Sequence, residues 1–232
     1  MEPIALRRSI SGKLIKRYTT PVPDQWLIYT TREMNPKSFP RAYERLGRFK
    51  SQNTCKEVSE GKHPWWALHR PRDPSIFASP KIIGLTTTKR IEVIFDNSDN
   101  LVVTDAMYVF RLKSGIHPMA ALGVLHSSLF LFLYRVSNQG EARVIPQIKA
   151  AKLGPLPFPD LANIAQKAQH DRMVQLVEQM LKTKAQVSTA KTESDRTYLE
   201  DKCAGLDRQI DQLTYDIYDL TPEEVSLVEH GS

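Results

Sequence analysis

The apolar positions of the chain are organised around the stretch 118–159, which contains the longest apolar run. Apolar residues are almost continuous over 120–134, and they predict one buried helix. A polar loop follows over 137–143, then a short extended piece and a second small helix. The stretch closes on Leu156-Pro157-Phe158-Pro159, where alternate prolines forbid helix. A compact module is therefore expected to end here.

Beyond residue 160 the pattern changes to heptads, typical of packed helices. Apolar positions step by four and three residues in two series, over 173–187 and 199–220. The two series are out of phase, which allows either a stutter in one long helix or a turn near 192–195. Because Thr-Glu-Ser-Asp at the turn has good N-cap chemistry, we favour two antiparallel helices. A third short helix is expected to start at Thr221-Pro222.

Before residue 118, short runs of apolar and β-branched residues predict strands at 26–30, 81–86 and 91–95. The turn-forming segment 96–100 leads into a returning strand at 101–112, which predicts a hairpin over 90–112. A surface helix is expected over 41–60, and the four prolines of 62–80 predict an ordered loop. In that loop Trp65 and Trp66 are expected to act as core anchors.

These elements predict an α+β fold: a twisted β-sheet recognition module with flanking helices, followed by a C-terminal helical hairpin or coiled-coil stalk. The expected domains are residues 1–160 and residues 161–232.

The net charge of +6 is divided unevenly between these two parts. Residues 1–160 contain 24 Lys and Arg against 13 Asp and Glu, a net charge of +11. Residues 161–232 contain 8 against 13, a net charge of −5. A basic module favours a polyanionic partner, because neutralising phosphates releases counterions. Charge that serves solubility alone is the alternative.

Several classes of function lack their sequence signals. The glycines show no phosphate-loop spacing, and the two cysteines and six histidines show no metal-ligand pattern. The nearest nuclease-like motif, Glu200-Asp201-Lys202, lies inside a predicted helix. The run 120–134 is interrupted by polar residues and is shorter than the ~20 residues of a membrane span. We expect no catalytic centre, no metal, no membrane contact and, by default, a cytoplasmic location.

Three segments of the basic part offer side chains suited to DNA: the proline-rich loop, the end of the strand at 81–86, and the segment that follows the apolar helix. Arginine and glutamine bind guanine and adenine edges in bidentate fashion, whereas lysine suits phosphate. For each residue, plain surface solvation is the alternative. The candidate DNA contacts are Arg70, Arg72, Lys81, Thr87, Thr88, Lys89, Arg90, Arg143, Gln147, Lys149 and Lys152.

Several segments, taken in order, resemble the TaqI-like C-terminal specificity domain, the target-recognition part of type IIG restriction–modification adenine-N6 DNA methyltransferases. The ending at 125–159 is also similar to that of type I specificity subunits. The segments are 11–18 (SGKLIKRY), 26–29, 43–46, 66–74 (WALHRPRDP), 80–83, 125–159 and 208–221.

The resemblance implies a module for sequence-specific recognition of double-stranded DNA that positions a methyltransferase or nuclease partner. The chain lacks the Asn-Pro-Pro-Tyr-type motif of the methyltransferase domain, since Asn35-Pro36-Lys37-Ser38 lies in the wrong context. We therefore expect a stand-alone or truncated specificity module that is not an enzyme. S-adenosylmethionine and Mg²⁺ are expected only on a catalytic partner.

The alternative is a protein-interaction or oligomerisation module without DNA specificity of its own. Its heptad helices would dock a methyltransferase or nuclease polypeptide, or a second copy of the chain. An independent nuclease or methyltransferase is disfavoured for want of motifs.

Overall fold

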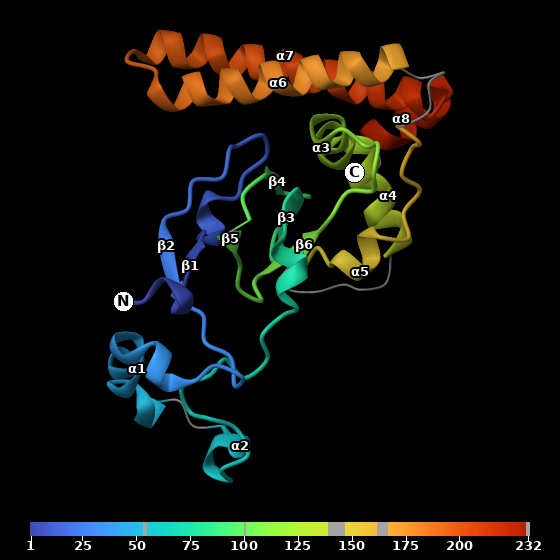
Figure 1. Ribbon diagram of the computed structural model, residues 1–232. Helices are drawn as coiled ribbons and strands as arrows, with labels where there is room; N and C mark the ends of the chain where they lie inside the picture. Colours follow the sequence, from blue (N-terminus) through green and yellow to red (C-terminus); the bar gives the residue numbers. More distant parts are fainter. Residues whose placement is uncertain (53–54, 100, 139–146, 162–166, 231–232) are drawn as a thin grey trace.

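The computed structural model describes residues 1–52, 55–99, 101–138, 147–161 and 167–230. A long helical hairpin lies along one end of the molecule, two small sheets and three helices lie beneath it, and two short helices form the opposite end (Figure 1). The strands are β1 (Leu6–Ser9), β2 (Gln25–Ile28), β3 (Lys81–Leu85), β4 (Val93–Asp96), β5 (Leu101–Val102) and β6 (Met107–Phe110). The helices are α1 (Pro40–Gly47), α2 (Lys56–Ser59), α3 (Pro118–His126), α4 (Ser128–Ser137), α5 (Ala150–Leu153), α6 (Lys167–Thr189), α7 (Glu193–Ile217) and α8 (Pro222–His230). The predicted α+β class is confirmed.

The strands form two three-stranded sheets instead of one, in the orders β2-β1-β5 and β4-β3-β6. The predicted hairpin over 90–112 is wrong, because β3 lies between β4 and β6 and pairs antiparallel with both. Ile82 and Ile83 point to opposite faces of β3, and both are fully buried, as a central strand requires. The short strand β5 leaves this sheet and pairs parallel with β1.

The predicted helix over 41–60 is also wrong. Helix α1 ends at Gly47, a 3-10 turn follows over Lys50–Gln52, and α2 is a separate single turn. Phe39 and Ala42 form a small separate core here. The ring of Trp66 lies 5.4 Å from that of Phe39, and the ring of Trp65 lies 5.0 Å from that of Tyr43. Both tryptophans therefore anchor this end of the molecule, as expected.

The apolar run predicted as one helix is broken at Ser127 into α3 and α4, which meet at 60°. Ser127 has extended backbone angles, and its hydroxyl accepts a hydrogen bond from the amide of Phe130 at 3.2 Å. Such N-capping starts a new helix, even though apolar residues resume directly after residue 128. No single described helix has the length and apolar character to cross a membrane, although the bent pair meets these criteria together.

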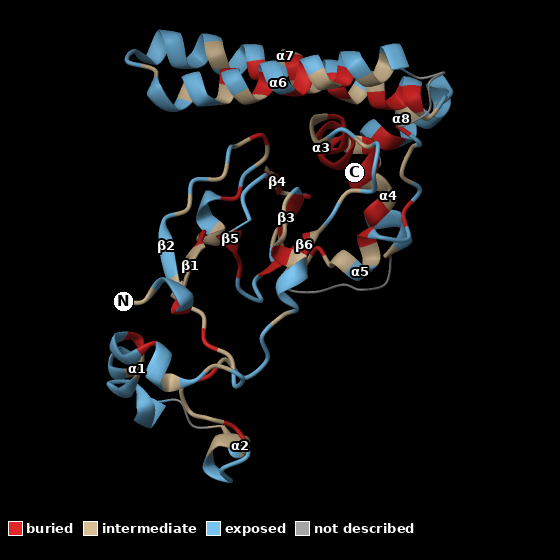
Figure 2. Ribbon diagram, in the orientation of Figure 1, coloured by how far each residue is buried: buried red, intermediate tan, exposed pale blue. Residues whose placement is uncertain are grey.

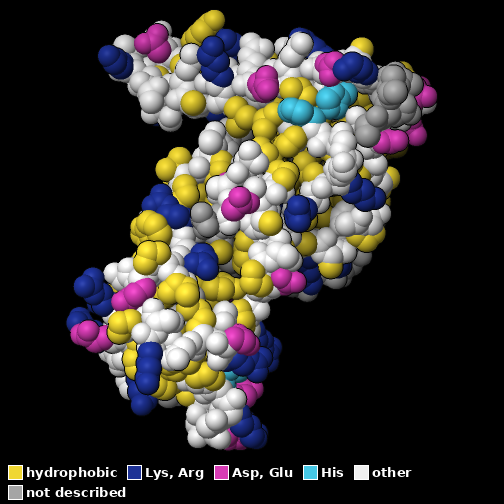
Figure 3. All heavy atoms as spheres, viewed as in Figure 1, with side chains coloured by type: hydrophobic (Ala, Val, Ile, Leu, Met, Phe, Trp, Pro, Cys, Tyr) yellow, Lys and Arg dark blue, Asp and Glu magenta, His cyan; other side chains and the backbone are white. Residues whose placement is uncertain are grey.

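The C-terminal hairpin agrees with the sequence in detail. Thr192 caps α7 by accepting from the amide of Asp195 at 3.0 Å. Thr221 and Glu224 form a reciprocal capping box at the start of α8, with bonds of 2.9 and 3.3 Å. The expected turn and the expected third helix are both present. The outer side of the hairpin is largely exposed and carries charges of both signs (Figures 2 and 3).

The largest hydrophobic core crosses residue 160. It contains Tyr18, Ile82 and Leu122 from the first part of the chain, and Met173 and Ile210 from the hairpin. Buried positions on α6 and α7 accordingly lie over α3 (Figure 2). The division into two domains at residue 160 stays a prediction. Because the core spans this boundary, removal of the hairpin would expose the apolar surface of α3 to water.

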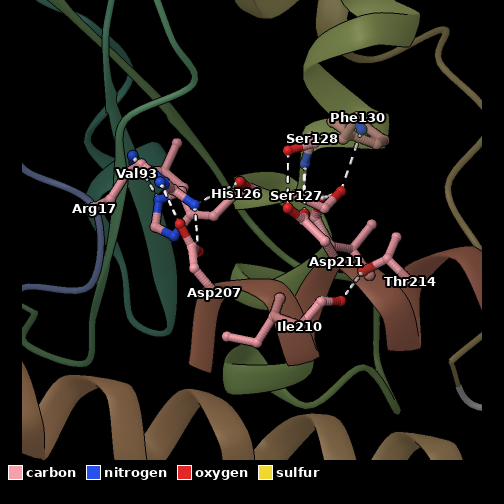
Figure 4. A network of polar contacts seen from close by, with 11 residues as sticks. Arg17, Val93, His126, Ser127, Ser128, Phe130, Asp207, Ile210, Asp211 and Thr214 are labelled. Atoms are coloured by element: carbon pink, nitrogen blue, oxygen red, sulfur yellow. Dashed lines mark hydrogen bonds and ion pairs between the residues drawn. The ribbon is translucent and has the colours of Figure 1, made fainter. Parts of the chain in front are cut away.

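Two charged side chains occupy the break between α3 and α4 (Figure 4). The guanidinium of Arg17 donates to the carbonyl oxygen of His126, at the C-terminus of α3, at 2.9 Å. The carboxylate of Asp211 accepts from the amide and the hydroxyl of Ser128, at the N-terminus of α4, at 2.7 and 2.8 Å. A cation at a helix C-terminus and an anion at an N-terminus each oppose the partial charge of the helix end.

The same contacts attach the hairpin to the rest of the molecule. Arg17 forms a bidentate ion pair with Asp207 of α7, with N–O distances of 2.7 and 3.0 Å. The side chain of His126 reaches the sheet, where its Nε2 accepts from the amide of Val93 at 3.3 Å. Burial lowers the pKa of His126 well below its usual value, so the ring is neutral. We call Arg17, His126, Ser128, Asp207 and Asp211 the helix-break clamp.

We predict opposite effects for two glycine-to-alanine changes. At Gly123 in α3, an added Cβ would lie 2.3 Å from Sδ of the buried Met173. Gly123→Ala should therefore lower the free energy of unfolding by about 1–3 kcal/mol, as overpacking of a core does. At Gly205 in α7 an added Cβ meets no atom within 4 Å, so Gly205→Ala should raise it by about 0.5–1 kcal/mol. Urea unfolding measures both; equal effects would contradict the close packing of α3 on α6.

Asp211→Ala should lower the free energy of unfolding by about 1–3 kcal/mol, because the part-buried amide of Ser128 loses its acceptor. Asp211→Asn, which retains an acceptor oxygen, should lose less. Asp201→Ala, at an exposed position of the same helix, is the matched control and should change stability by less than about 0.5 kcal/mol. If Asp211→Ala behaves like the control, the clamp does not stabilise the fold.

The stability difference between Asp211→Asn and the native protein should depend on pH. Burial raises the pKa of the Asp211 carboxyl above its usual value, against the opposing hydrogen bonds from Ser128. The stability linked to this shift is present below the unfolded pKa, about 4, and is lost as pH rises through the folded pKa. The Asn variant should therefore gain stability relative to the native protein as pH rises above about 4. Urea titrations across this range measure the sign.

Candidate nucleic-acid interface

Two of the three predicted contact segments lie side by side. The amide of Ile148 donates to the carbonyl of Thr86 at 2.7 Å, which joins the segment after the apolar helices to the end of β3. The hydroxyl of Tyr134 in α4 holds the same segment: it donates to the carbonyl of Gln147 and accepts from the amide of Lys149, both at 3.1 Å. The loop after β3 and the segment 147–152 therefore form one continuous region.

Further basic residues line two hollows, one at each of these two segments. Arg90 and Arg135 line one hollow of about 250 Å³ between the β3–β4 loop and α4. Arg111 and Lys113, which directly follow β6, line a second hollow of about 480 Å³ beside α5. One carboxylate, that of Asp160, also lines the second hollow. We define the basic face as Lys89, Arg90, Arg111, Lys113, Arg135, Lys149 and Lys152.

The predicted residues of the β3–β4 loop are accessible. Thr87, Lys89 and Arg90 are exposed, and Thr88 is half-buried. The hydroxyl of Thr88 accepts from the amide of Arg90 at 3.4 Å, and this contact helps to shape the loop. Gln147, Lys149 and Lys152 are half-buried at the neighbouring segment. Hydroxyl, amide and basic side chains thus occur together in this region, and these are the types that contact base edges and phosphates.

Lys81 requires a correction. It lies opposite Asp96 in the β3–β4 register, its side chain is fully buried, and its Nζ lies 2.6 Å from a carboxylate oxygen of Asp96. Its Nζ also donates to the carbonyl of Ser98. Lys81 therefore neutralises a buried carboxylate inside the sheet and does not reach the surface.

Of the two arginines in the proline-rich loop, Arg70 is exposed and Arg72 is half-buried. The guanidinium of Arg72 donates to the carbonyls of Thr104 and Met107, at 3.2 and 2.8 Å. It therefore ties the proline-rich loop to the segment before β6, a structural role that the sequence did not reveal. Arg143, the remaining candidate, lies outside the described residues.

Three residues of the basic face were not predicted from the sequence. For Arg111, Lys113 and Arg135 the signal that would have found them is position: two follow a buried strand directly, and Arg135 lies in the last turn of an apolar helix. Outside the basic face, Trp26 on β2 is 61% exposed and lies beneath the guanidinium of Arg8, 4.8 Å from the ring centre. An exposed aromatic ring beside an arginine is typical of surfaces on which nucleic-acid bases stack.

Metal-ligating side chains converge elsewhere. Within the described ranges, the group whose ligand atoms lie close together is Cys55, Glu57 and His69, next to α2. Figure 1 places α2 at the end of the molecule opposite the hairpin, whereas the basic face lies beside β6, α4 and α5.

The comparisons with known proteins identify a family. The family model of the TaqI-like C-terminal specificity domain matches residues 7–158. No curated protein matches the chain. Because the family match covers most of the chain, the family is established, and its role is DNA target recognition in restriction–modification. The chain belongs to the family of TaqI-like C-terminal specificity domains.

Proposed function

We propose that this chain recognises a specific sequence in double-stranded DNA and positions a methyltransferase or nuclease partner on it. The observation that carries the proposal is the basic face, on which the β3–β4 loop and the segment 147–152 are joined by the bond from Ile148 to Thr86. This face lies within the residues that match the specificity-domain family.

The two kinds of side chain in this region would make different contacts with DNA. The cations of the basic face contact phosphates, which fix the orientation of the protein but carry no sequence information. Thr87 and Gln147 lie among them and have the hydrogen-bonding groups that base edges require. Arg70, exposed in the proline-rich loop, extends the contacts toward α1 and α2.

The catalytic steps belong to the partner. It would bind S-adenosylmethionine and Mg²⁺, and the hairpin would dock it or a second copy of the chain. The heptad seam is already used within the chain, because Cys203, Leu206 and Ile210 are buried against the core. A partner would therefore dock on the outer side of the hairpin, where Tyr198 is 67% exposed. This arrangement disfavours the alternative of an interaction module that associates through the seam.

The test is binding of the full chain to a randomised duplex pool, followed by fluorescence anisotropy at increasing salt and by sequencing of the retained DNA. The full chain is required because the hairpin completes the core. An enriched motif, with affinity that falls as salt rises, is the expected result. Salt-sensitive binding without a motif would assign sequence readout to the complex with the partner. Absence of binding at low salt would refute DNA recognition by this chain.

Charge reversal of Lys89 and Arg90 together should weaken DNA binding by at least ten-fold, because two phosphate contacts become repulsive. The slope of log K against log salt should fall by about 1 for each phosphate that the protein no longer neutralises. Reversal of Lys191 and Arg196, exposed at the tip of the hairpin, is the matched control and should leave affinity unchanged. Size-exclusion chromatography should show one oligomeric state for all variants. Equal affinities of the two double variants would place the DNA elsewhere.

A further inference from the structure

Three side chains with different metal-ligating atoms converge beside α2. The Sγ of Cys55, a carboxylate oxygen of Glu57 and a ring nitrogen of His69 all lie within 4.8 Å of one another. Nε2 of His69 and Oε2 of Glu57 are 3.3 Å apart. Two ligands placed tetrahedrally at about 2.0–2.1 Å from one zinc ion are separated by about 3.4 Å. The distance between Nε2 of His69 and Oε2 of Glu57 therefore matches the distance expected between two ligands of one zinc ion.

Hydrogen bonds and ring contacts within the loop hold these three side chains near one another. The carbonyl of Glu57 accepts from the amides of Lys62 and His63, at 2.8 and 3.0 Å. The ring of His63 is buried, pairs with the carbonyl of Ala67 at 3.2 Å, and packs against the ring of His69 with centres 5.0 Å apart. The backbone bonds to Glu57 fold the chain back toward Cys55. The contact with the ring of His63 holds the imidazole of His69 in place.

The ligand atoms are also accessible. The side chains of His69 and Glu57 are 37% and 46% exposed, and Cys55 is half-buried. An ion can therefore reach the group from solvent.

We propose that Cys55, Glu57 and His69 form a binding site for a zinc-type divalent transition metal. A thiolate, an imidazole and a carboxylate together select this class over Mg²⁺ and Ca²⁺, which prefer oxygen ligands alone. The three side chains leave the fourth tetrahedral position to water. Binding releases the proton of the Cys55 thiol, because the thiolate is the ligand.

The position of the site gives the metal a structural role. This end of the molecule has only a small core of Phe39, Ala42 and Ala5, with Trp66 packed against it. A metal that joins Cys55 to His69 closes the loop between them and fixes the residue that precedes Arg70. Short segments with little core commonly gain their stability from such a metal. The ion would thus order the exposed arginine of the proline-rich loop without contacting DNA.

The test is titration of the full, metal-depleted chain with ZnCl₂ and, separately, with CoCl₂. We expect one equivalent of each metal per chain, release of about one proton per ion, and a thiolate-to-cobalt charge-transfer absorption band. In Cys55→Ala and in His69→Ala, affinity should fall by more than about ten-fold, because even outer-shell partners change metal affinity by about 10–100-fold.

Two matched controls come from elsewhere in the chain. Cys203→Ala removes the other cysteine, and His170→Ala removes a histidine whose Nδ1 lies 2.9 Å from the carboxylate of Asp171 without a nearby thiol. Both variants should keep the full affinity and the cobalt band. Circular dichroism should confirm that Cys55→Ala is folded; if it is not, the cobalt band of the native chain and of Cys203→Ala still tests the thiolate. Substoichiometric binding, or a cobalt spectrum without the band, would leave an ordinary His69–Glu57 ion pair and overturn the proposal.

Discussion

The structure depends on how one break in an apolar helix is satisfied. At Ser127 the carbonyl end of α3 and the amide end of α4 meet inside the protein, where water does not solvate them fully. Arg17 supplies a cation to the first end and Asp211 an anion to the second. The two side chains come from the N-terminal segment and from α7, so three regions that are distant in sequence are fixed relative to one another by one pair of helix ends.

The basic face rests on this arrangement. Ser128, which Asp211 holds, lines the same hollow as Arg90 and Arg135. His126, whose carbonyl Arg17 binds, is attached through its ring to the amide of Val93 in β4, just beyond the β3–β4 loop. The position of the proposed DNA contacts is thus coupled to the packing of the hairpin, even though the hairpin itself carries a net negative charge.

Features encoded by adjacent residues were predictable from the sequence. The caps at Thr192 and Thr221 are local, and so is the heptad seam of α7. Features that depend on pairs of residues far apart in the sequence were not predictable. The pairing of β5 with β1 and the burial of Lys81 opposite Asp96 depend on which strands become neighbours. The break at Ser127 was not predicted, although the polar residues His126, Ser127 and Ser128 interrupt the apolar run there, because apolar residues resume directly after them. Both candidate contact segments were named from the sequence, but their adjacency through Ile148 and Thr86 was not predicted.

The core that crosses residue 160 has a consequence for biosynthesis. During translation, α3 with its nearly all-apolar surface leaves the ribosome well before α6 and α7, which cover it. The apolar surface of α3 therefore stays exposed to water until the last third of the chain is synthesised. Contacts of such long sequence separation slow folding and leave intermediates open to aggregation. Chaperone demand and soluble yield in cells should accordingly depend on how quickly the hairpin is synthesised.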